Sequence, residues 1–507
     1  MSVLTLLAAF ACDGRGPPSS NAVADASLGS LSQEQLRDPR TCQGCHPTHY
    51  DQWRGSMHAY ASADPVFHAM NQKGQHETQG ALGTFCVNCH APLATRLGLT
   101  EDGLNLAQLP SEVQGVGCYA CHAASHVERL DNNGIELAGD GVMRGGIAQP
   151  VETAAHGSSA SPLHASQDLR SATLCGACHD VRTAAGVHLE RTFAEWRDSL
   201  FGSNSREQSG QLSCNACHMP SRTGSAAPGV PGTPERTVHD HRFPAVDVAL
   251  TPFPGVSPTD RAIAAEQTER VQQLLDTSLG IEICVQPLSQ SRAAVFVILE
   301  NASAGHRWPS GAAQDRRAWV QLKAYREGED DPFWSSGTEL PGTALANSDA
   351  NRWVLRDRMF DESGNEVHSF WEARHIEQHT LPAPVTRDPS SPDFLISHVT
   401  RRYPLDPAQT LPELPSRVSV LVRLQPIGGD ILAELVDEGY LSATIADAMP
   451  VFDLIPNRHL ATHPTLSRLA RATFEWSAET QAYSGFAKRT LNDEAFPKHC
   501  VRMAAPR

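Results

Sequence analysis

The pattern of apolar and polar positions changes in character near residue 280 of the chain. Just before it, Arg261–Ser278 repeats its apolar residues with the 3.6-residue period of an amphipathic helix. Beyond it, short β-branched segments are separated by turn residues at a spacing typical of a β-sandwich. The segments predicted to form strands are Ile281–Pro287, Ala293–Leu299, Ala318–Tyr325 and Arg417–Leu424.

The chain before residue 250 has few long periodic apolar runs. Helices are predicted around Pro47–Met70 and Thr192–Phe201, with irregular chain between them. Residues 219–260 are dense in Pro, Gly and Ser, which is typical of a domain edge. We therefore expect a multidomain chain, with a mostly α and irregular domain over 38–250 and a mainly β, sandwich-like domain over 251–507 that begins with a helix.

The first residues, 1–12, contain an apolar run too short to cross a bilayer as a helix. It has the size of a secretory signal core, and Ala9-Phe10-Ala11 fits a cleavage site. Cys12 follows at once, so a lipoprotein signal that leaves Cys12 lipidated is an alternative interpretation. Residues 13–37 are small and polar and predict a flexible linker. We expect no transmembrane helix, and a location in the periplasm or on the outer cell surface, with Cys12 as the candidate lipid anchor.

Net charge excludes some classes of partner, and aromatic content indicates what fills the interior. The formal net charge of −16 argues against nucleic acid as a partner, because phosphate binding needs a cationic face. It also argues against docking on an anionic membrane surface. With 16 Phe, 8 Trp and 7 Tyr among 507 residues, aromatic side chains are scarce. Something other than aromatic side chains is expected to fill part of the interior.

Ten of the 13 cysteines lie in five copies of the pattern Cys-x-x-Cys-His. Two thiols at this spacing reach the two vinyl groups of one porphyrin, and the following histidine becomes the proximal iron ligand. Zinc ribbons need pairs of cysteine pairs, and thioredoxin-like motifs occur singly within a βαβ pattern. The pattern therefore predicts five covalently attached haem c groups in a pentahaem cytochrome c domain over 38–250. The motif residues are Cys42, Cys45 and His46; Cys86, Cys89 and His90; Cys118, Cys121 and His122; Cys175, Cys178 and His179; and Cys214, Cys217 and His218.

A low-spin haem iron also needs a sixth ligand, usually His or Met. The chain has 23 histidines, which leaves a large surplus over the five in the motifs. His49 and His126 lie close to their own motifs, where spanning to the opposite face of the same haem is less favourable. The better-placed candidates for distal ligands are His58, His156, His164, His239, His241 and, from the β-rich domain, His306.

Three cysteines lie outside the motifs: Cys12, Cys284 and Cys500. Haem attachment takes place outside the cytoplasm, where disulfides persist. If Cys12 is lipidated or removed, Cys284 and Cys500 remain as a pair. We hypothesise a disulfide between them that ties the first strand of the β-rich domain to the C-terminus.

The run Cys-x-x-Cys-His-x-x-x-Tyr-x-x-Trp-x-x-Ser-x-His, from Cys42 to His58, resembles the opening of cytochrome c554-type multihaem cytochromes. The stretch from Leu174 to Pro220, with the last two motifs, is similar to the same family. Gly305-His306-x-x-Pro-x-Gly311, followed by Arg316-Arg317-x-Trp319, resembles a β-rich region of some larger relatives. The resemblance implies a closely stacked haem domain, electron transfer outside the cytoplasm and bis-His ligation at most irons, with His58 as the firmest distal ligand. The type member has four haems, one of them without a sixth ligand, so its haem order cannot be transferred to five.

Two functions remain compatible with these residues. The first is an electron carrier that passes electrons through five haems to redox partner proteins such as other cytochromes. The second is an oxidoreductase with one open haem that acts on a small nitrogen or sulfur oxyanion, with Arg144, Arg242 or His76 as binding groups. The surplus of histidine and the lack of a Cys-x-x-Cys-Lys variant favour the carrier over the enzyme.

Overall fold

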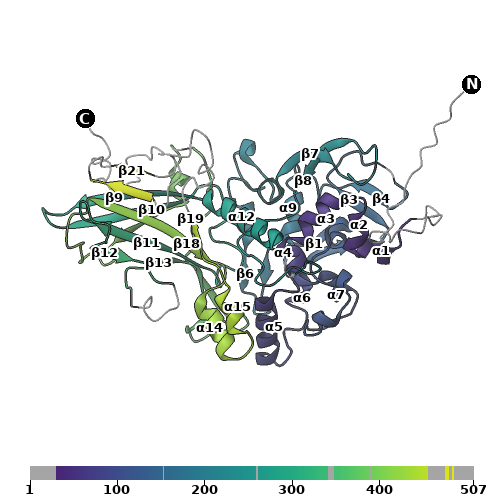
Figure 1. Ribbon diagram of the computed structural model, residues 1–507, viewed down its shortest axis with the longest axis horizontal. Coiled ribbons are helices and arrows are strands. Elements are labelled where there is room, and N and C mark those ends of the chain that lie inside the picture. The colour runs from purple at the N-terminus through teal and green to yellow at the C-terminus, as the bar shows by residue number, and fades with distance from the viewer. Residues whose placement is uncertain are drawn as a thin grey trace, which may run out of the picture. The chain divides into compact units, whose positions relative to one another are not determined.

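A computed structural model describes residues 30–151, 153–257, 261–340, 348–388, 390–454, 474–478 and 482–484 (Figure 1). The chain divides into two compact units. The first unit comprises Met1–Asp180 and Leu212–Gln267, and the second comprises Val181–Gln211 and Thr268–Arg507. Among the described residues, no helix is long and apolar enough to cross a membrane. The predicted export segment 1–12 and Cys500 lie outside the described residues.

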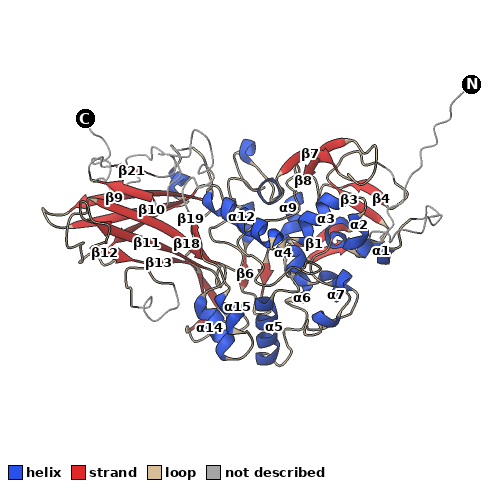
Figure 2. Cartoon of the chain, in the orientation of Figure 1, coloured by secondary structure: helices blue, strands red, loops and turns tan. Residues whose placement is uncertain are grey.

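The first unit consists of short helices, two-stranded sheets and much irregular chain (Figure 2). Its helices are α1 (Gln33–Arg37), α2 (Pro39–Gln43), α3 (Pro47–Arg54), α4 (Met57–Tyr60), α5 (Pro65–Glu77), α6 (Val87–His90), α7 (Pro92–Arg96), α8 (Cys118–His122), α9 (Ser171–Gly176) and α11 (Asn215–His218). Its sheets pair β1 (Ala124–Arg129) with β2 (Gly134–Leu137), β3 (Val142–Gly145) with β4 (Gly157–Ala160), and β7 (Ser221–Ser225) with β8 (Glu235–His239). The first helix lies within residues 13–37, where a flexible linker is predicted.

Proline and glycine explain why the helix predicted around Pro47–Met70 is broken into three. Helix α3 begins at Pro47 and ends at Arg54, with Gly55 as its C-cap, and α4 follows with the Ser56 side chain accepting from the backbone of Ala59. Helix α5 then begins at Pro65, which holds the preceding residue in an extended conformation. The region is helical as predicted, but in three segments that change direction.

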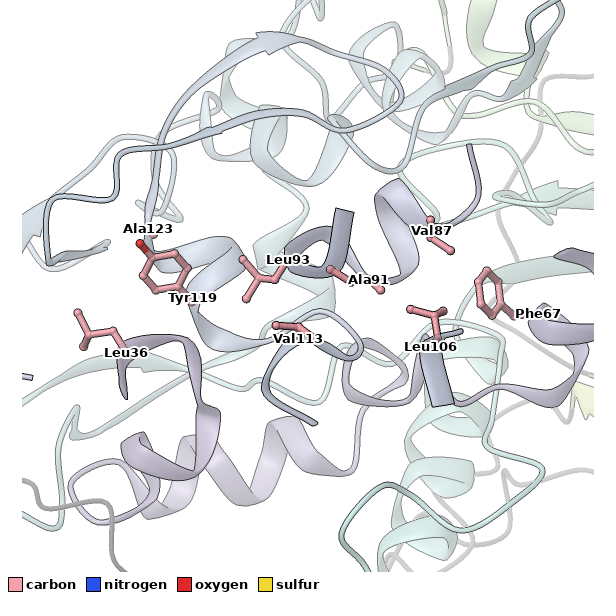
Figure 3. Close-up of a cluster of buried hydrophobic side chains, with 10 residues drawn as sticks. Leu36, Phe67, Val87, Ala91, Leu93, Leu106, Val113, Tyr119 and Ala123 are labelled. Atoms are coloured by element: carbon pink, nitrogen blue, oxygen red, sulfur yellow. The ribbon is translucent and has the colours of Figure 1, made fainter. Parts of the chain in front are cut away.

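One apolar cluster of the first unit consists of ten buried side chains. Figure 3 shows it, with Phe67 and Leu106 near one end and Leu36 and Tyr119 near the other. The buried members are Leu36, Phe67, Val87, Ala91, Leu93, Ala94, Leu106, Val113, Tyr119 and Ala123. Several of these side chains are only a methyl group, so the cluster contributes little apolar volume for a unit of this size.

The second unit is rich in antiparallel strands. One sheet has the order β17 (His398–Tyr403), β10 (Ala293–Asn301) and β9 (Leu279–Pro287). The other has the order β12 (Trp334–Ser336), β11 (Arg317–Tyr325), β18 (Arg417–Gln425), β20 (Phe474–Ser477) and β21 (Ala482–Ser484), with β13 (Trp353–Leu355) on β11 and β19 (Phe452–Leu454) on β18. Strand β20 lies against β9, so the two sheets contact each other.

The long strands of the second unit are buried on both faces. Nearly every residue of β10, β11 and β18 is buried, which is the pattern of strands covered on both sides. The four strand segments predicted from the sequence are confirmed as parts of β9, β10, β11 and β18. The predicted amphipathic helix is confirmed as α12 (Ala262–Asp276).

The second unit has further short strands and helices. They are β5 (Val181–Arg182), β6 (His188–Glu190), α10 (Thr192–Arg197), β14 (Asp357–Phe360), β15 (Glu366–Val367), β16 (His375–Gln378), α14 (Gly429–Asp437) and α15 (Ala443–Asp447). Residues 181–211, assigned by composition to the domain over 38–250, group here with the C-terminal part. Two contacts hold them: Arg191 pairs with the buried Asp357, and Glu195 accepts a hydrogen bond of 2.6 Å from the Ser310 hydroxyl.

Candidate haem sites

Each Cys-x-x-Cys-His motif forms or adjoins one helical turn. The histidine N–H donates to the carbonyl of the first cysteine, at 2.8 Å from His46 to Cys42 and 3.0 Å from His179 to Cys175. This hydrogen bond closes a turn that brings the first cysteine and the histidine to the same face. Local backbone structure therefore presents each pair of thiols together with its imidazole.

The motif thiols differ in one respect. Nine are free thiols, whereas Cys45 is disulfide-bonded. A sulfur engaged in a disulfide cannot form a thioether, so haem attachment at the first motif requires Cys45 to be reduced first. Cys284 is disulfide-bonded as well, but its predicted partner Cys500 lies outside the described residues.

Four motif histidines share one hydrogen-bond arrangement, in which ring atom Nδ1 lies against a backbone carbonyl. The pairs are His46 with Ala226 at 2.7 Å, His90 with Ala61 at 3.1 Å, His122 with Arg144 at 2.6 Å and His218 with Pro244 at 2.7 Å. Because a carbonyl oxygen can only accept, Nδ1 carries the proton in each ring. In this tautomer Nε2 carries the lone pair, so a metal would bind through Nε2.

The imidazoles are also kept neutral. Burial lowers the pKa of His46, His90 and His122 below the ordinary histidine value. Burial lowers the pKa of His58 and of His241 further, each to about 3. A neutral imidazole is the form that binds a metal, so these side chains are competent ligands at neutral pH.

Three motif histidines each face a candidate distal histidine from elsewhere in the first unit. The ring centroids are 6.4 Å apart for His46 and His156, 6.2 Å for His179 and His58, and 6.2 Å for His122 and His241. An iron atom held about 2 Å from the Nε2 atoms of two imidazoles would set their centroids about 6 Å apart. The spacing and the donor set of the three pairs therefore fit a haem iron.

The third motif has a second histidine nearby, and hydrogen bonding distinguishes the two. His164 lies 5.5 Å from His122, but its Nε2 atom donates to the Cys121 carbonyl at 2.9 Å. Its Nδ1 atom is buried without a hydrogen-bond partner among the described residues. His241 has the opposite arrangement, with Nδ1 on the His239 carbonyl at 2.9 Å. The tautomer of His241 thus suits a ligand through Nε2, whereas that of His164 leaves the lone pair on Nδ1.

A similar comparison applies at the first motif. His49, set aside because it is close to its own motif, lies 6.3 Å from His46 at an interplanar angle of 61°. His156 lies nearly parallel to His46, at 26°, and its Nδ1 atom bonds the Gly157 carbonyl at 3.0 Å. The hydrogen bond to Nδ1 favours His156 as the distal partner.

The two remaining candidates have the same tautomer but different surroundings. His239, at the end of β8, bonds through Nδ1 to the Met219 carbonyl at 2.7 Å. His306 belongs to the second unit, where its Nδ1 atom bonds the Arg307 carbonyl at 2.7 Å. Their roles as ligands stay predictions.

Aromatic contacts to the imidazoles were not foreseen from the sequence. Phe67 stacks on His90, with centroids 4.2 Å apart and planes within 10°. Phe243 meets His58 edge to face at 4.4 Å. The only sequence signal for Phe243 is its position two residues after His241, in the run His239-Asp-His-Arg-Phe-Pro244.

The residues proposed to bind an oxyanion are otherwise engaged. The guanidinium of Arg144 pairs with Asp140 at 2.6 Å. That of Arg242 pairs with Asp240 at 2.6 Å and with Glu266 at 2.9 Å. His76 is exposed at the end of α5. Both guanidinium groups are therefore already neutralised by carboxylates, and the oxyanion-binding role of the three residues stays a prediction.

Comparison with known proteins gives a family match over part of the chain and a similar fold. Residues 41–123 match the family of cytochrome c554 and c-prime. The chain is similar in fold to a penta-heme cytochrome c552 from Thermochromatium tepidum, with a TM-score of 0.56 and 19% sequence identity, over 84% of this chain and 98% of that one. No curated protein matches the sequence significantly.

Proposed function

We propose that the chain is a multihaem c-type cytochrome that carries electrons through five haem c groups, and the match over residues 41–123 supports this proposal. Most of the irons are bis-His ligated, and the electrons pass to and from redox partner proteins outside the cytoplasm. The five motifs supply the thioether cysteines and the proximal histidines. The observation that carries the proposal is the set of three histidine pairs with centroids 6.2 to 6.4 Å apart.

Ligand assignments follow from these pairs. His156 serves the first motif, His241 the third and His58 the fourth, each opposite the histidine of that motif. Bound haem supplies a one-electron ferric/ferrous couple whose potential depends on axial ligands, burial and hydrogen bonds. The chain's own contribution is to exclude water around the buried imidazoles and, at the first and third motifs, to fix the tautomer of both ligands through Nδ1–H···O=C bonds.

Alanine variants of three histidines test the assignments. His58→Ala and His241→Ala should each convert one low-spin haem into a species that binds carbon monoxide when reduced, because each loses its sixth ligand. His164→Ala removes a ring that lies 5.5 Å from His122 but has its Nε2 atom hydrogen-bonded to the Cys121 carbonyl, and should keep the wild-type spectrum. His126→Ala, on the exposed face of β1, is a surface control. If His58→Ala and His241→Ala keep the wild-type spectrum, the assignments are wrong.

Haem content tests the five-haem proposal separately. Intact-mass measurement of the mature protein should show five haem additions, which requires Cys45 to be in a thioether and not in a disulfide. Four additions, with the first motif empty and Cys45 oxidised, would contradict the count. Peptide mapping of Cys42–His46 identifies which state is present.

One observation favours the alternative function as a redox enzyme. At the second motif the ring that packs against His90 is Phe67, not an imidazole. If the reduced wild-type protein binds carbon monoxide at one haem, this motif is the first place to look for an open iron. Assays with nitrite, hydroxylamine and sulfite would then follow. If the Soret band does not move, every iron is six-coordinate and the carrier function is favoured.

A further inference from the structure

The segment His239–Pro244 of the first unit contacts the candidate sites of three motifs. His241 lies 6.2 Å from His122 of the third motif. The Pro244 carbonyl accepts a hydrogen bond of 2.7 Å from His218 of the fifth motif. Phe243, between them, packs on His58, which faces His179 of the fourth motif. Six consecutive residues thus connect the surroundings of three separate motifs.

Phe243 is the point at which two of these sites meet. Its ring centroid lies 4.4 Å from that of His58, with an interplanar angle of 65°. It lies 5.7 Å from that of His241, with an angle of 76°. Both contacts are edge to face, which is a favourable geometry for aromatic rings. One phenyl ring therefore contacts the distal histidines assigned to the third and fourth motifs.

The backbone at Phe243 adopts a conformation that this residue rarely takes. Its φ angle is +48°, in the left-handed region that favours glycine and is unfavourable for a bulky side chain. The following residue is Pro244, which restricts the backbone of Phe243 still more. Such conformations persist where the surroundings fix them, and they concentrate at functional sites. Glycine would adopt this backbone conformation at a lower cost. The presence of phenylalanine here therefore indicates that the phenyl ring itself has a role.

Hydrogen bonds on both sides hold Phe243 in place. The N–H of His241 donates to Gln52 Oε1 at 3.1 Å, and the N–H of Arg242 donates to Asp240 Oδ1 at 2.8 Å. The Arg242 guanidinium bonds the same aspartate at 2.6 Å. On the other side, His218 fixes the Pro244 carbonyl. The segment is anchored at each end, and Phe243 has little freedom to move away from the two imidazoles.

We propose that Phe243 is a positioning residue that sets the ring orientations of His58 and His241 together, and so couples the spectroscopic and redox properties of the haems at the third and fourth motifs. This inference rests on the proposed function and on the assignment of those two histidines. Residues that pack against a metal ligand fix its orientation and tune the metal. A contact shared by two ligands transmits a change at one site to the other.

Two substitutions at one position separate the ring from the backbone. Phe243→Gly removes the ring and relieves the unfavourable φ angle, whereas Phe243→Tyr keeps both the ring and the unfavourable backbone. Phe243→Leu keeps apolar volume without an aromatic ring and is the second variant if the glycine form does not mature. Phe253→Leu is the matched control, because Phe253 is a buried phenylalanine of the first unit that packs on Tyr60 at 5.5 Å.

The readouts are the electron paramagnetic resonance spectrum of the oxidised holoprotein and a spectroscopic redox titration. Phe243→Gly and Phe243→Leu should shift the low-spin signals and midpoint potentials of two haems while all haems remain bound. Phe243→Tyr and Phe253→Leu should retain the wild-type spectrum. Unchanged spectra in the glycine and leucine variants, or an equal shift in the Phe253→Leu control, would overturn the inference. If the wild-type protein itself has no bis-His low-spin signals, the proposed function is wrong, whatever the effect of the Phe243 variants.

Discussion

The two units of the molecule fill their interiors in different ways. In the second unit, strands β10, β11 and β18 bury apolar side chains on both faces, and Trp319 and Tyr403 are fully enclosed. In the first unit the apolar cluster is small, and between the short helices lie half-buried thiols and imidazoles. The interior of the first unit thus contains polar, metal-binding groups in place of apolar side chains. Its stability is therefore expected to depend on bound haem. The second unit is expected to be stable through the packing of its own apolar side chains, without a bound cofactor.

The largest effect expected from this difference follows from withholding haem. A chain produced without haem attachment should lose protection from hydrogen exchange in α3, α8 and α9, because the small apolar cluster of the first unit is insufficient alone. Strands β10, β11 and β18 should keep theirs. Hydrogen exchange with mass spectrometry, peptide by peptide, compares this chain with the holoprotein. Equal loss of protection in both units would show that the second unit also depends on haem.

A smaller effect, confined to the second unit, is expected from Trp319→Ala. The side chain is fully buried, and its indole N–H donates to the Gly337 carbonyl at 3.0 Å. Removing it should cost about 3 to 5 kcal/mol of unfolding free energy, because it leaves a cavity and an unsatisfied carbonyl. Denaturant unfolding followed by far-ultraviolet circular dichroism measures the cost.

Two further observations make the Trp319→Ala result specific. Trp334→Ala, on the short strand β12, is the control and should cost less, because Trp334 is only partly buried. The haem absorbance spectrum of the Trp319→Ala variant should be that of the wild type. A change in this spectrum would mean that packing in the second unit affects the haem sites of the first. That result would contradict the view that the two units are stabilised independently.

Part of the fold was accessible from periodicity, and the exceptions have physical reasons. Strands β9, β10, β11 and β18 and helix α12 followed the predicted patterns, because β-branched runs and the 3.6-residue period act locally. The breaks between α3, α4 and α5 depend on Gly55 and Pro65. A prediction from apolar periodicity alone does not take these two residues into account. The grouping of residues 181–211 with the second unit depends on distant partners such as Asp357, which no local pattern reveals.

The candidate site divides in the same way. The motif cysteines and histidines could be identified from sequence, because five contiguous residues contain the chemistry of attachment. The carbonyls that fix their tautomers, at Ala226 and Ala61 for example, are backbone atoms and have no residue signature. The choice between His241 and His164 likewise depends on which ring nitrogen is hydrogen-bonded. Contacts such as these appear only when the chain is folded.

The smallest predicted effect is a pH dependence confined to the second unit, at Asp315. Burial of its carboxyl raises the pKa from 3.8 to about 6, although the guanidinium groups of Arg317 and Arg316 act in the opposite direction. Between about pH 4 and 6 the folded chain therefore holds a proton that the unfolded chain has released. The free energy of unfolding should fall as the pH rises through this window, and stay at its lower value above it.

The full shift corresponds to about 3 kcal/mol, but Asp315 is partly exposed as a residue, so we expect about 1 to 3 kcal/mol. Asp315→Asn cannot ionise, so it should flatten the decline and leave the second unit more stable at pH 7 than the wild type. Asp330→Asn makes the same chemical change on an exposed turn and should leave the decline intact. Denaturant unfolding at a series of pH values, followed by circular dichroism of the strands, measures all three proteins. If the free energy of unfolding declines equally in Asp315→Asn and in the wild type, the Asp315 carboxyl is not the cause of the decline. The second unit would then tolerate the buried Asp315 charge as well as it tolerates exposed charges.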